Sequence, residues 1–258
     1  MIAYLPLGIR CYIWILVFVL GAVMGSGLNC LAYRIAHGEK WSRGRSACAH
    51  CGHVLGAKDL VPLLSFLLLK GKCRYCGVKL SLRYFLTELL LGLCYVATVA
   101  RFGISWDAAS GLVLISCLFA LSLVDLEIQI IPDRFLIIAA GVRMVQLAME
   151  GRFFGGMIPA LIFGGGLFLL SLVMDRILKK ESMGGGDIKL VAVLGLYFSV
   201  PECLLLMMLA CVFGIAGAKT MTKSDSDGAF PFGPALSLAA MVTLLIGEPV
   251  TGWYLNLL

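Results

Sequence analysis

Charged side chains are scarce in this chain of 258 residues. Asp, Glu, Lys and Arg make up 14% of the sequence, whereas soluble proteins average about 25%. Hydrophobic residues reach 60%, and the mean hydropathy is +0.98. A soluble core does not need so many long apolar runs. The composition therefore excludes an ordinary soluble domain and indicates a membrane protein.

The sequence also lacks a recognisable cleavable signal peptide. The first apolar run, residues 11–33, is long and has no clear small-x-small cleavage site, so we expect a true membrane span. Seven further apolar runs are candidate spans, at about 82–100, 108–124, 134–150, 155–174, 188–200, 202–218 and 234–256. The sequence thus predicts an all-α polytopic membrane protein with about eight transmembrane helices.

Positive charge is distributed unevenly along the chain. Of the 21 Lys and Arg residues, 10 lie between Arg34 and Arg83. The segments after the first, third, fifth and seventh predicted spans hold 17 in all, whereas the N-terminus and the other loops hold three. The positive-inside rule then places the basic loops in the cytoplasm and both termini outside. We interpret the cluster as a topology signal, and we expect no nucleic-acid partner.

Ten cysteines are present, and four of them form two Cys-x-x-Cys pairs. The pairs are Cys48 with Cys51 and Cys73 with Cys76; both lie in the polar loop 35–81, and a Gly follows each pair. Two such pairs about twenty residues apart are typical of a structural zinc site with four thiolate ligands. Disulfides and redox-active thiols are the alternatives, and a cytoplasmic location disfavours disulfides.

Two aspartates stand at the edges of apolar runs. Asp125 ends the third predicted span, and Asp187 precedes the sixth, after Gly184, Gly185 and Gly186. An Asp after such a loop is typical of a helix N-cap. The predicted topology, however, puts both carboxylates at cytoplasmic ends and at matching depth. Two close carboxylates can share a proton and activate water, so we predict a catalytic pair, with the glycines leaving room for an extended substrate.

Four other acids need an interpretation. Glu88 lies inside the second predicted span, where an acid is costly and functional by default. We expect it to support the substrate; the alternative is a buried hydrogen-bond partner for Asn29 or for an Arg. Asp133, Glu127 and Asp175 are rivals for the second catalytic position, although their charged or turn contexts favour the membrane interface.

Together these residues resemble the type IV prepilin peptidases over nearly the whole chain. The first Cys pair reads Cys-Ala-His-Cys, where the family usually has Pro after the first Cys, but the four ligands are intact. The segments that carry the resemblance are Gly25-Ser26 to Arg34, both Cys pairs, Asp59 to Ser65, Arg83-Tyr84 to Glu88, Val124-Asp125-Leu126, Ile131-Pro132-Asp133, Gly184 to Leu190, and Pro231-Phe232-Gly233-Pro234.

The resemblance implies a GxGD-type membrane aspartic endopeptidase of the bacterial inner membrane. Its substrates would be prepilins of type IV pili or pseudopilins of type II secretion, cut after a Gly at the end of a basic leader on the cytoplasmic face. It also implies N-methylation of the new N-terminal residue, usually Phe, with S-adenosylmethionine as the methyl donor. The sequence assigns no residues to a methyl-donor site.

We expect three parts in the chain: a first transmembrane helix (1–34), a cytoplasmic zinc-binding loop domain (35–81) and a transmembrane aspartic protease domain (82–258). Anionic membrane lipids are expected partners of the net-positive loop. The alternatives are a proton-coupled transporter and a non-enzymatic secretion-assembly protein. Membrane acids at one depth would also suit a transporter, but few charges lie near the external ends of the spans.

Overall fold

The structure is a computed structural model of the chain that describes residues 6–40, 44–179, 183–221 and 231–257, without the side chains of 220 and 221. The described residues form helices and loops, with two isolated antiparallel bridges and no strand. The prediction of an all-α architecture is therefore confirmed. The chain divides into two compact units, Met1–Leu123 and Val124–Leu258, and each is described by itself.

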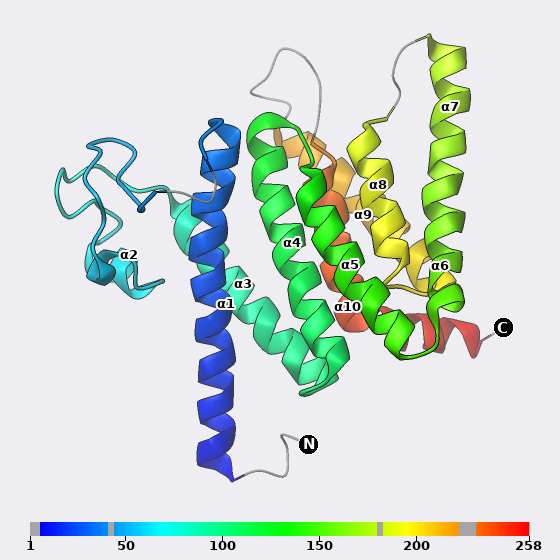
Figure 1. Cartoon of the computed structure of the whole chain (residues 1–258), viewed down its shortest axis with the longest axis horizontal. Coiled ribbons are helices and arrows are strands. Elements are labelled where there is room, and N and C mark those ends of the chain that lie inside the picture. The colour runs from blue at the N-terminus through cyan, green and yellow to red at the C-terminus, as the bar shows by residue number, and fades with distance from the viewer. Residues whose placement is uncertain (1–5, 41–43, 180–182, 222–230, 258) are drawn as a thin grey trace. The chain divides into compact units, whose positions relative to one another are not determined.

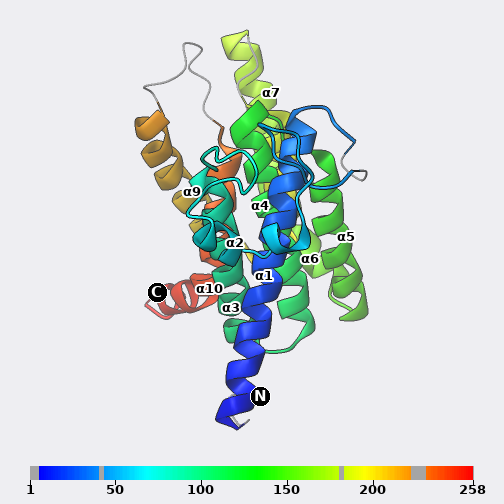
Figure 2. The same cartoon turned by 90° about the vertical axis from the view of Figure 1, so that its left-hand side faces the viewer.

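Unit 1 consists of long apolar helices and one polar loop. Figures 1 and 2 both show α1 alongside α3, with the loop extending from their adjoining ends. The elements are α1 (Leu7–Ala36), η2 (Ala57–Asp59), α2 (Leu64–Leu68), α3 (Leu82–Phe102) and the first part of α4 (Trp106–Ile128).

Glycines allow α1 and α3 to approach closely. A Cβ atom added at Gly21 would lie 2.8 Å from the Cα of Gly92, and one added at Gly25 would lie 3.0 Å from the Cα of Glu88. Small residues at such positions are a common basis of helix association in membranes, where there is no hydrophobic driving force between helices. This contact brings the two ends of the loop 35–81 together.

Unit 2 contains the end of α4 and the remaining helices. Pro159 lies inside the helical run that starts at α6, and the π-helical turn η3 follows it directly. The elements are α5 (Asp133–Met149), α6 (Phe153–Ala160), η3 (Leu161–Gly165), α7 (Gly166–Leu178), α8 (Gly185–Gly195), α9 (Val200–Met221) and α10 (Gly233–Leu255).

Within the described residues, six helices are long and apolar enough to cross a membrane: α1, α3, α4, the run from α6 to α7, α9 and α10. The polytopic membrane prediction is therefore confirmed. The two other predicted spans, 134–150 and 188–200, coincide with α5 and α8, which have 17 and 11 residues. The count of about eight thus corresponds to six full-length helices and two shorter ones.

Candidate active site and metal centre

Asp125 lies near the end of α4 and is only 4% exposed. The backbone N–H of Gly233, at the start of α10, donates a hydrogen bond to its Oδ2 at 3.1 Å. A Cβ atom at position 233 would lie 2.6 Å from the same oxygen. Only glycine therefore lets the backbone of α10 reach this carboxylate without displacing it.

Asp187 lies in the first turn of α8 and is partly buried. Gly184 is the N-cap, and the N–H of Asp187 bonds to the Gly184 carbonyl at 3.1 Å. The expectation that Asp187 is itself the N-cap is wrong, because the helix begins at Gly185. Burial and then the negative charge of Asp125 raise the pKa of Asp187 to about 6. The segments that carry the two carboxylates also meet at Ile131, since added Cβ atoms at Gly186 and Gly233 would lie 2.9 Å and 3.4 Å from its side chain.

The three glycines before Asp187 have different surroundings. A Cβ atom at Gly186 would lie 2.9 Å from the Cβ of Ile131, whereas one at Gly185 would meet nothing within 4 Å. A Cβ atom at Gly184 would lie 3.3 Å from Oδ2 of Asp187. Gly186 is therefore needed for close packing against the segment before α5, whereas Gly185 is exposed with open space beside it.

The three acids considered as alternatives for the second catalytic position have other partners or are exposed. Asp133 forms an ion pair with Lys189, with both oxygens 2.9 Å from Nζ, and both side chains are more than half exposed. Glu127 is exposed. Asp175 accepts a hydrogen bond from Ser171 one turn earlier in α7, at 3.4 Å. The charge of Asp125, by contrast, acts directly on Asp187.

The four loop cysteines lie together. The Sγ atoms of Cys48, Cys51, Cys73 and Cys76 are all within 4.8 Å of one another, and those of Cys48 and Cys76 are 3.9 Å apart. A tetrahedral zinc ion with Zn–S bonds of about 2.3 Å would place its sulfurs roughly 3.8 Å apart. The cluster therefore fits a four-thiolate zinc ion and leaves no ligand position for water.

Each Cys pair forms the same tight turn. The N–H of Gly52 bonds to the Cys48 carbonyl at 2.9 Å, and the N–H of Gly77 bonds to the Cys73 carbonyl at 3.0 Å. Both glycines have positive φ, +68° and +71°, which favours glycine. Hydrogen bonds from the backbone, first at Cys51, lower the pKa of Cys48 to about 6. The turn thus stabilises the thiolate form that binds metal.

Side chains connect the two turns with the segment between them. Asp59 accepts hydrogen bonds from Arg74 Nε at 2.6 Å and from the hydroxyl of Tyr75 at 3.1 Å. The Tyr75 ring in turn packs on His53, with centroids 3.6 Å apart. Hydrogen bonding to Arg74 lowers the pKa of Asp59. The two Cys turns are therefore also connected by side-chain contacts outside the sulfur cluster.

Glu88 is 8% exposed, on α3. Its Oε2 accepts a hydrogen bond from the backbone N–H of Leu63 at 2.7 Å, and Leu63 has the unusual φ of +61°. Asn29 bonds to Thr87 instead of to Glu88. Glu88 therefore fastens the middle of the loop to the helix pair, through a partner that the sequence did not indicate.

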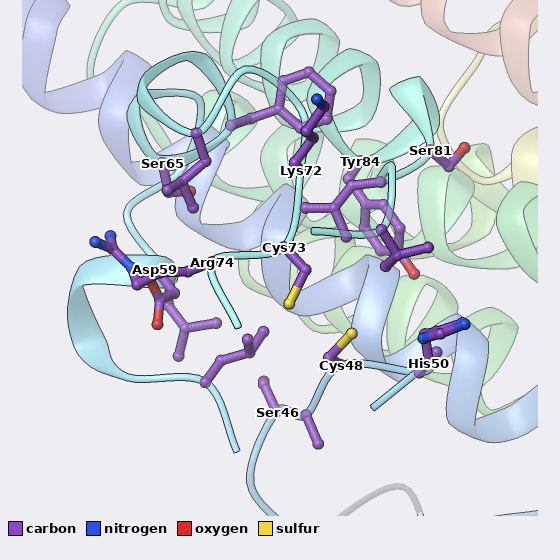
Figure 3. Close-up of a pocket in the computed structure, with 18 of the residues that line it drawn as sticks. Ser46, Cys48, His50, Asp59, Ser65, Lys72, Cys73, Arg74, Ser81 and Tyr84 are labelled. Carbon is purple, nitrogen blue, oxygen red and sulfur yellow. Dashed lines mark hydrogen bonds and ion pairs between the residues drawn. The ribbon is translucent and has the colours of Figure 1, made fainter. Parts of the chain in front are cut away.

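A cavity of about 370 Å³ lies beside the cysteine cluster in unit 1. Its walls come from α1, both Cys turns, α2 and the start of α3, and they include Lys72, Tyr84 and Glu88. Figure 3 shows the sulfur atoms of Cys48 and Cys73 directed towards each other at the wall of this cavity. Ligand pockets of small molecules typically begin at about 300 Å³, so the cavity can hold a ligand.

Sequence reasoning missed two features of these sites. The amide of Gly233 on Asp125 could have been suspected from the Pro-Phe-Gly-Pro motif, because a glycine between prolines indicates a special backbone position. The cavity could not have been found, because its walls come from segments between Ser26 and Glu88 that meet only in the fold.

Comparisons with known proteins agree on one family. Residues 19–102 match the bacterial peptidase A24 N-terminal domain, and residues 112–218 match the type IV leader peptidase family. A prepilin leader peptidase/N-methyltransferase of Stutzerimonas stutzeri is 32% identical over 92% of both chains. Proteins with the same name from Aeromonas hydrophila and Bacillus subtilis (strain 168) are 36% and 29% identical, over 82% and 94% of this chain and 75% and 98% of their own. No solved structure matches.

The fold and the two centres define a polytopic helical membrane protein that combines a buried pair of carboxylates with a four-cysteine loop. The match to the Stutzerimonas protein, 32% identical over 92% of both chains, narrows this class to one family. The chain belongs to the type IV leader peptidase family.

Proposed function

We propose that this chain is a membrane endopeptidase that removes the basic leader from type IV prepilins or pseudopilins, after a Gly. Asp125 and Asp187 are its catalytic residues. The observation that carries the proposal is the convergence of the two carboxylates from different helices. Gly233, whose amide bonds to Asp125, and Gly186, next to Asp187, both pack against Ile131. The names of the relatives support the substrate class.

The two carboxylates work as an acid and a base. Two close carboxylates do not both ionise readily, so below about pH 6, the pKa of Asp187, the pair holds one proton. The ionised carboxylate takes a proton from a water molecule, which attacks the carbonyl carbon of the scissile bond. The protonated carboxylate donates a hydrogen bond to the carbonyl oxygen.

Asp187 carries the shared proton in the free enzyme, and Asp125 is the ionised base. The helix dipole at the N-terminal end of α8 favours negative charge at Asp187. Burial and the charge of Asp125 outweigh it, because they raise the pKa of Asp187 to about 6. Because the pair titrates together, kinetic pKa values belong to the pair. The space beside Gly185, between Gly184 and Gly186, accommodates the extended substrate backbone.

Cleavage of a purified prepilin in detergent tests the assignment. We expect Asp125→Asn and Asp187→Asn each to lower kcat by at least about 1,000-fold, as removal of a general acid or base does. Glu127→Gln is the matched control, because this exposed acid lies only two residues from Asp125. Persistent cleavage by either Asn variant, or equal loss in the control, would contradict the dyad. Uptake of a solute into proteoliposomes, without cleavage of the prepilin, would instead favour the proton-coupled transporter.

The loop cysteines hold a structural zinc ion. Cys48, Cys51, Cys73 and Cys76 would be its ligands, and the bound ion would supply a cross-link within the loop. The fit rests on the sulfur separations and on the backbone hydrogen bonds to Cys48. Together with this role we propose the three-part division at residues 34 and 81, with the loop as a separate cytoplasmic module of an inner-membrane protein.

A second activity, N-methylation of the new N-terminal residue, is favoured by the cavity beside the cysteine cluster. Its size and mixed lining fit S-adenosylmethionine, which would supply an activated methyl group when bound. Glu88 would bind a cationic part of this donor, Lys72 its carboxylate, and Tyr84 would flank it. Glu88 would thus support the methyl-transfer substrate while it holds the Leu63 amide.

Binding of labelled S-adenosylmethionine to the full chain, measured by equilibrium dialysis, tests this site. We expect Glu88→Gln to raise Kd by about tenfold or more, because a hydrogen bond to a charged group is lost while the amide oxygen still accepts from Leu63. Glu39→Gln is the control, since Glu39 is exposed and outside the cavity. An unchanged Kd in Glu88→Gln would exclude the cavity as the donor site.

A further inference from the structure

The helix that carries Asp187 is too short to cross a bilayer. α8 has 11 residues, which corresponds to about 16 Å, whereas the hydrocarbon core is about 30 Å thick. A helix of this length that begins at the cytoplasmic face ends inside the membrane. Its last carbonyl groups have no water there and need partners from the protein.

Two side chains connect the C-terminal end of α8 with α5. Arg143 Nε, on α5, donates a hydrogen bond to the Leu196 carbonyl at 3.1 Å. The hydroxyl of Tyr197 donates to the Ala139 carbonyl of α5 at 2.8 Å. The Arg143 guanidinium also lies 5.4 Å from the centroid of the Tyr197 ring. A cation at a helix C-terminus interacts favourably with the helix dipole.

Placing the Arg143 side chain at its depth in the membrane has a high free-energy cost. It lies ten positions after the first residue of α5, which corresponds to about 15 Å along the helix. Insertion scales assign a central Arg a cost of about 2.5–3.5 kcal/mol. Its Nη1 donates to Gln146 at 2.9 Å, and Gln146 donates to Glu150 at 2.8 Å. The polar network is thus organised around the cap of α8.

The other contacts of α8 leave little room for adjustment. At its N-terminal end, Gly186 packs against Ile131, where an added Cβ atom would be 2.9 Å away. At its C-terminal end, a Cβ atom at Gly195 would lie 2.5 Å from the Cα of Ala160. A change at the Arg143 cap is therefore transmitted along α8 as a shift or tilt of a rigid element.

We infer that Arg143 is a positioning residue for the peptidase reaction. Together with Tyr197 it fixes the depth of α8 and hence the distance of Asp187 from Asp125. The inference rests on the proposed peptidase function. Arg143 acts through Leu196 and has no role in the chemistry. A displacement of about 1 Å at a catalytic group can cost about 100-fold in rate.

The test compares Arg143→Met, Arg143→Lys and Tyr197→Phe in prepilin cleavage by the full chain, with kcat, KM and the pH profile as readouts. We expect Arg143→Met to lower kcat by about 30- to 100-fold with little change in KM. The basic limb of its profile should move to lower pH by about one unit, because protonated Asp187 is then stabilised less by the charge of Asp125.

The partial replacements keep the inference falsifiable if Arg143→Met does not fold. In Arg143→Lys, the decrease in log kcat should be smaller than in Arg143→Met by at least about one third. In Tyr197→Phe, kcat should fall by about three- to tenfold, the effect expected for loss of a single hydrogen bond. Arg152→Met is the control, since Arg152 is exposed and lies outside the α5–α8 contact. A wild-type kcat and a wild-type basic limb in the folded Arg143 and Tyr197 variants would overturn the inference. Absence of cleavage by the wild type would instead count against the peptidase.

Discussion

The two centres of this chain are built in different ways. The four thiols come from one loop between residues 48 and 76, where two identical turns present them. The two carboxylates come from residues 125 and 187, and the packing of Gly186 and Gly233 against Ile131 brings their segments together. A loop centre of this kind depends on the ion that cross-links it, whereas a helix-borne centre depends on close packing at a few glycines.

Removal of the metal should therefore produce the largest difference between the two centres, because only the loop centre depends on the ion. We expect Cys73→Ser to abolish stoichiometric zinc binding and to expose the loop 35–81 to limited proteolysis, since the ion supplies the folding free energy of such small centres. The affinity for S-adenosylmethionine, the proposed methyl donor, should fall by about tenfold or more because Cys73 lines the cavity.

Metal analysis, proteolysis and dialysis would measure these effects. Cys94→Ser is the control, because this cysteine lies in α3 and outside the cluster. If the zinc content and the proteolytic pattern of Cys73→Ser equalled those of the wild type, the four-thiolate assignment would be wrong.

A single methyl group should affect the carboxylate centre selectively. Gly233→Ala would place a Cβ atom 2.6 Å from Oδ2 of Asp125, and we expect kcat for cleavage to fall by about 10- to 100-fold, because a small misplacement of a catalytic group is costly. Zinc content should stay unchanged. Gly252→Ala, in the same helix, meets nothing within 4 Å and is the control. Equal rates for the two variants would show that the carboxylate tolerates displacement.

The smallest expected effect concerns stability and its dependence on pH. The pKa of Asp187 is raised to about 6 in the folded protein, compared with about 3.9 when unfolded. The folded state thus binds more protons between these values, and the stability contributed by this group is complete below pH 4 and lost as the pH rises through 6.

Asp187→Asn removes this penalty. At pH 8 we expect its melting temperature to exceed that of the wild type by about 2–4 °C, roughly 1 kcal/mol after allowance for solvent screening. Below pH 4 the difference should vanish. Thermal melts in detergent at both pH values would measure it. A melting temperature at pH 8 no higher than that of the wild type would indicate that the Asp187 carboxylate is ionised without penalty.

Periodicity and spacing were sufficient for much of the fold. The apolar runs predicted the six full-length helices and the two shorter ones, α5 and α8, because length and hydropathy alone decide such elements. The Cys spacing predicted a cluster, since a metal turn is a local structure. The start of α8 was misplaced, because the hydrogen bond from Asp187 to Gly184 extends the helix by a first turn of glycines.

Contacts between distant segments were beyond the sequence. The positive-inside argument placed Asp125 and Asp187 at one depth, but depth does not determine distance. Neither the Gly233 amide on Asp125 nor the Leu63 amide on Glu88 follows from local pattern, because each joins segments that are 25 or more positions apart. Arg143 was recognisable only as a charge within a span, and its partner at Leu196 emerged from the packing of α5 and α8.

The four-cysteine cluster also changes how the loop carries charge. Residues 35–81 contain eight Lys and Arg and only two acids. Four thiolates around a divalent ion add a net charge of about −2, which is lost when the thiols take up protons after metal removal. We therefore expect chelation to make the loop more cationic, and its attraction to anionic lipid headgroups to become stronger and more sensitive to salt. On this expectation, the metal content of the loop would adjust its adhesion to the membrane surface.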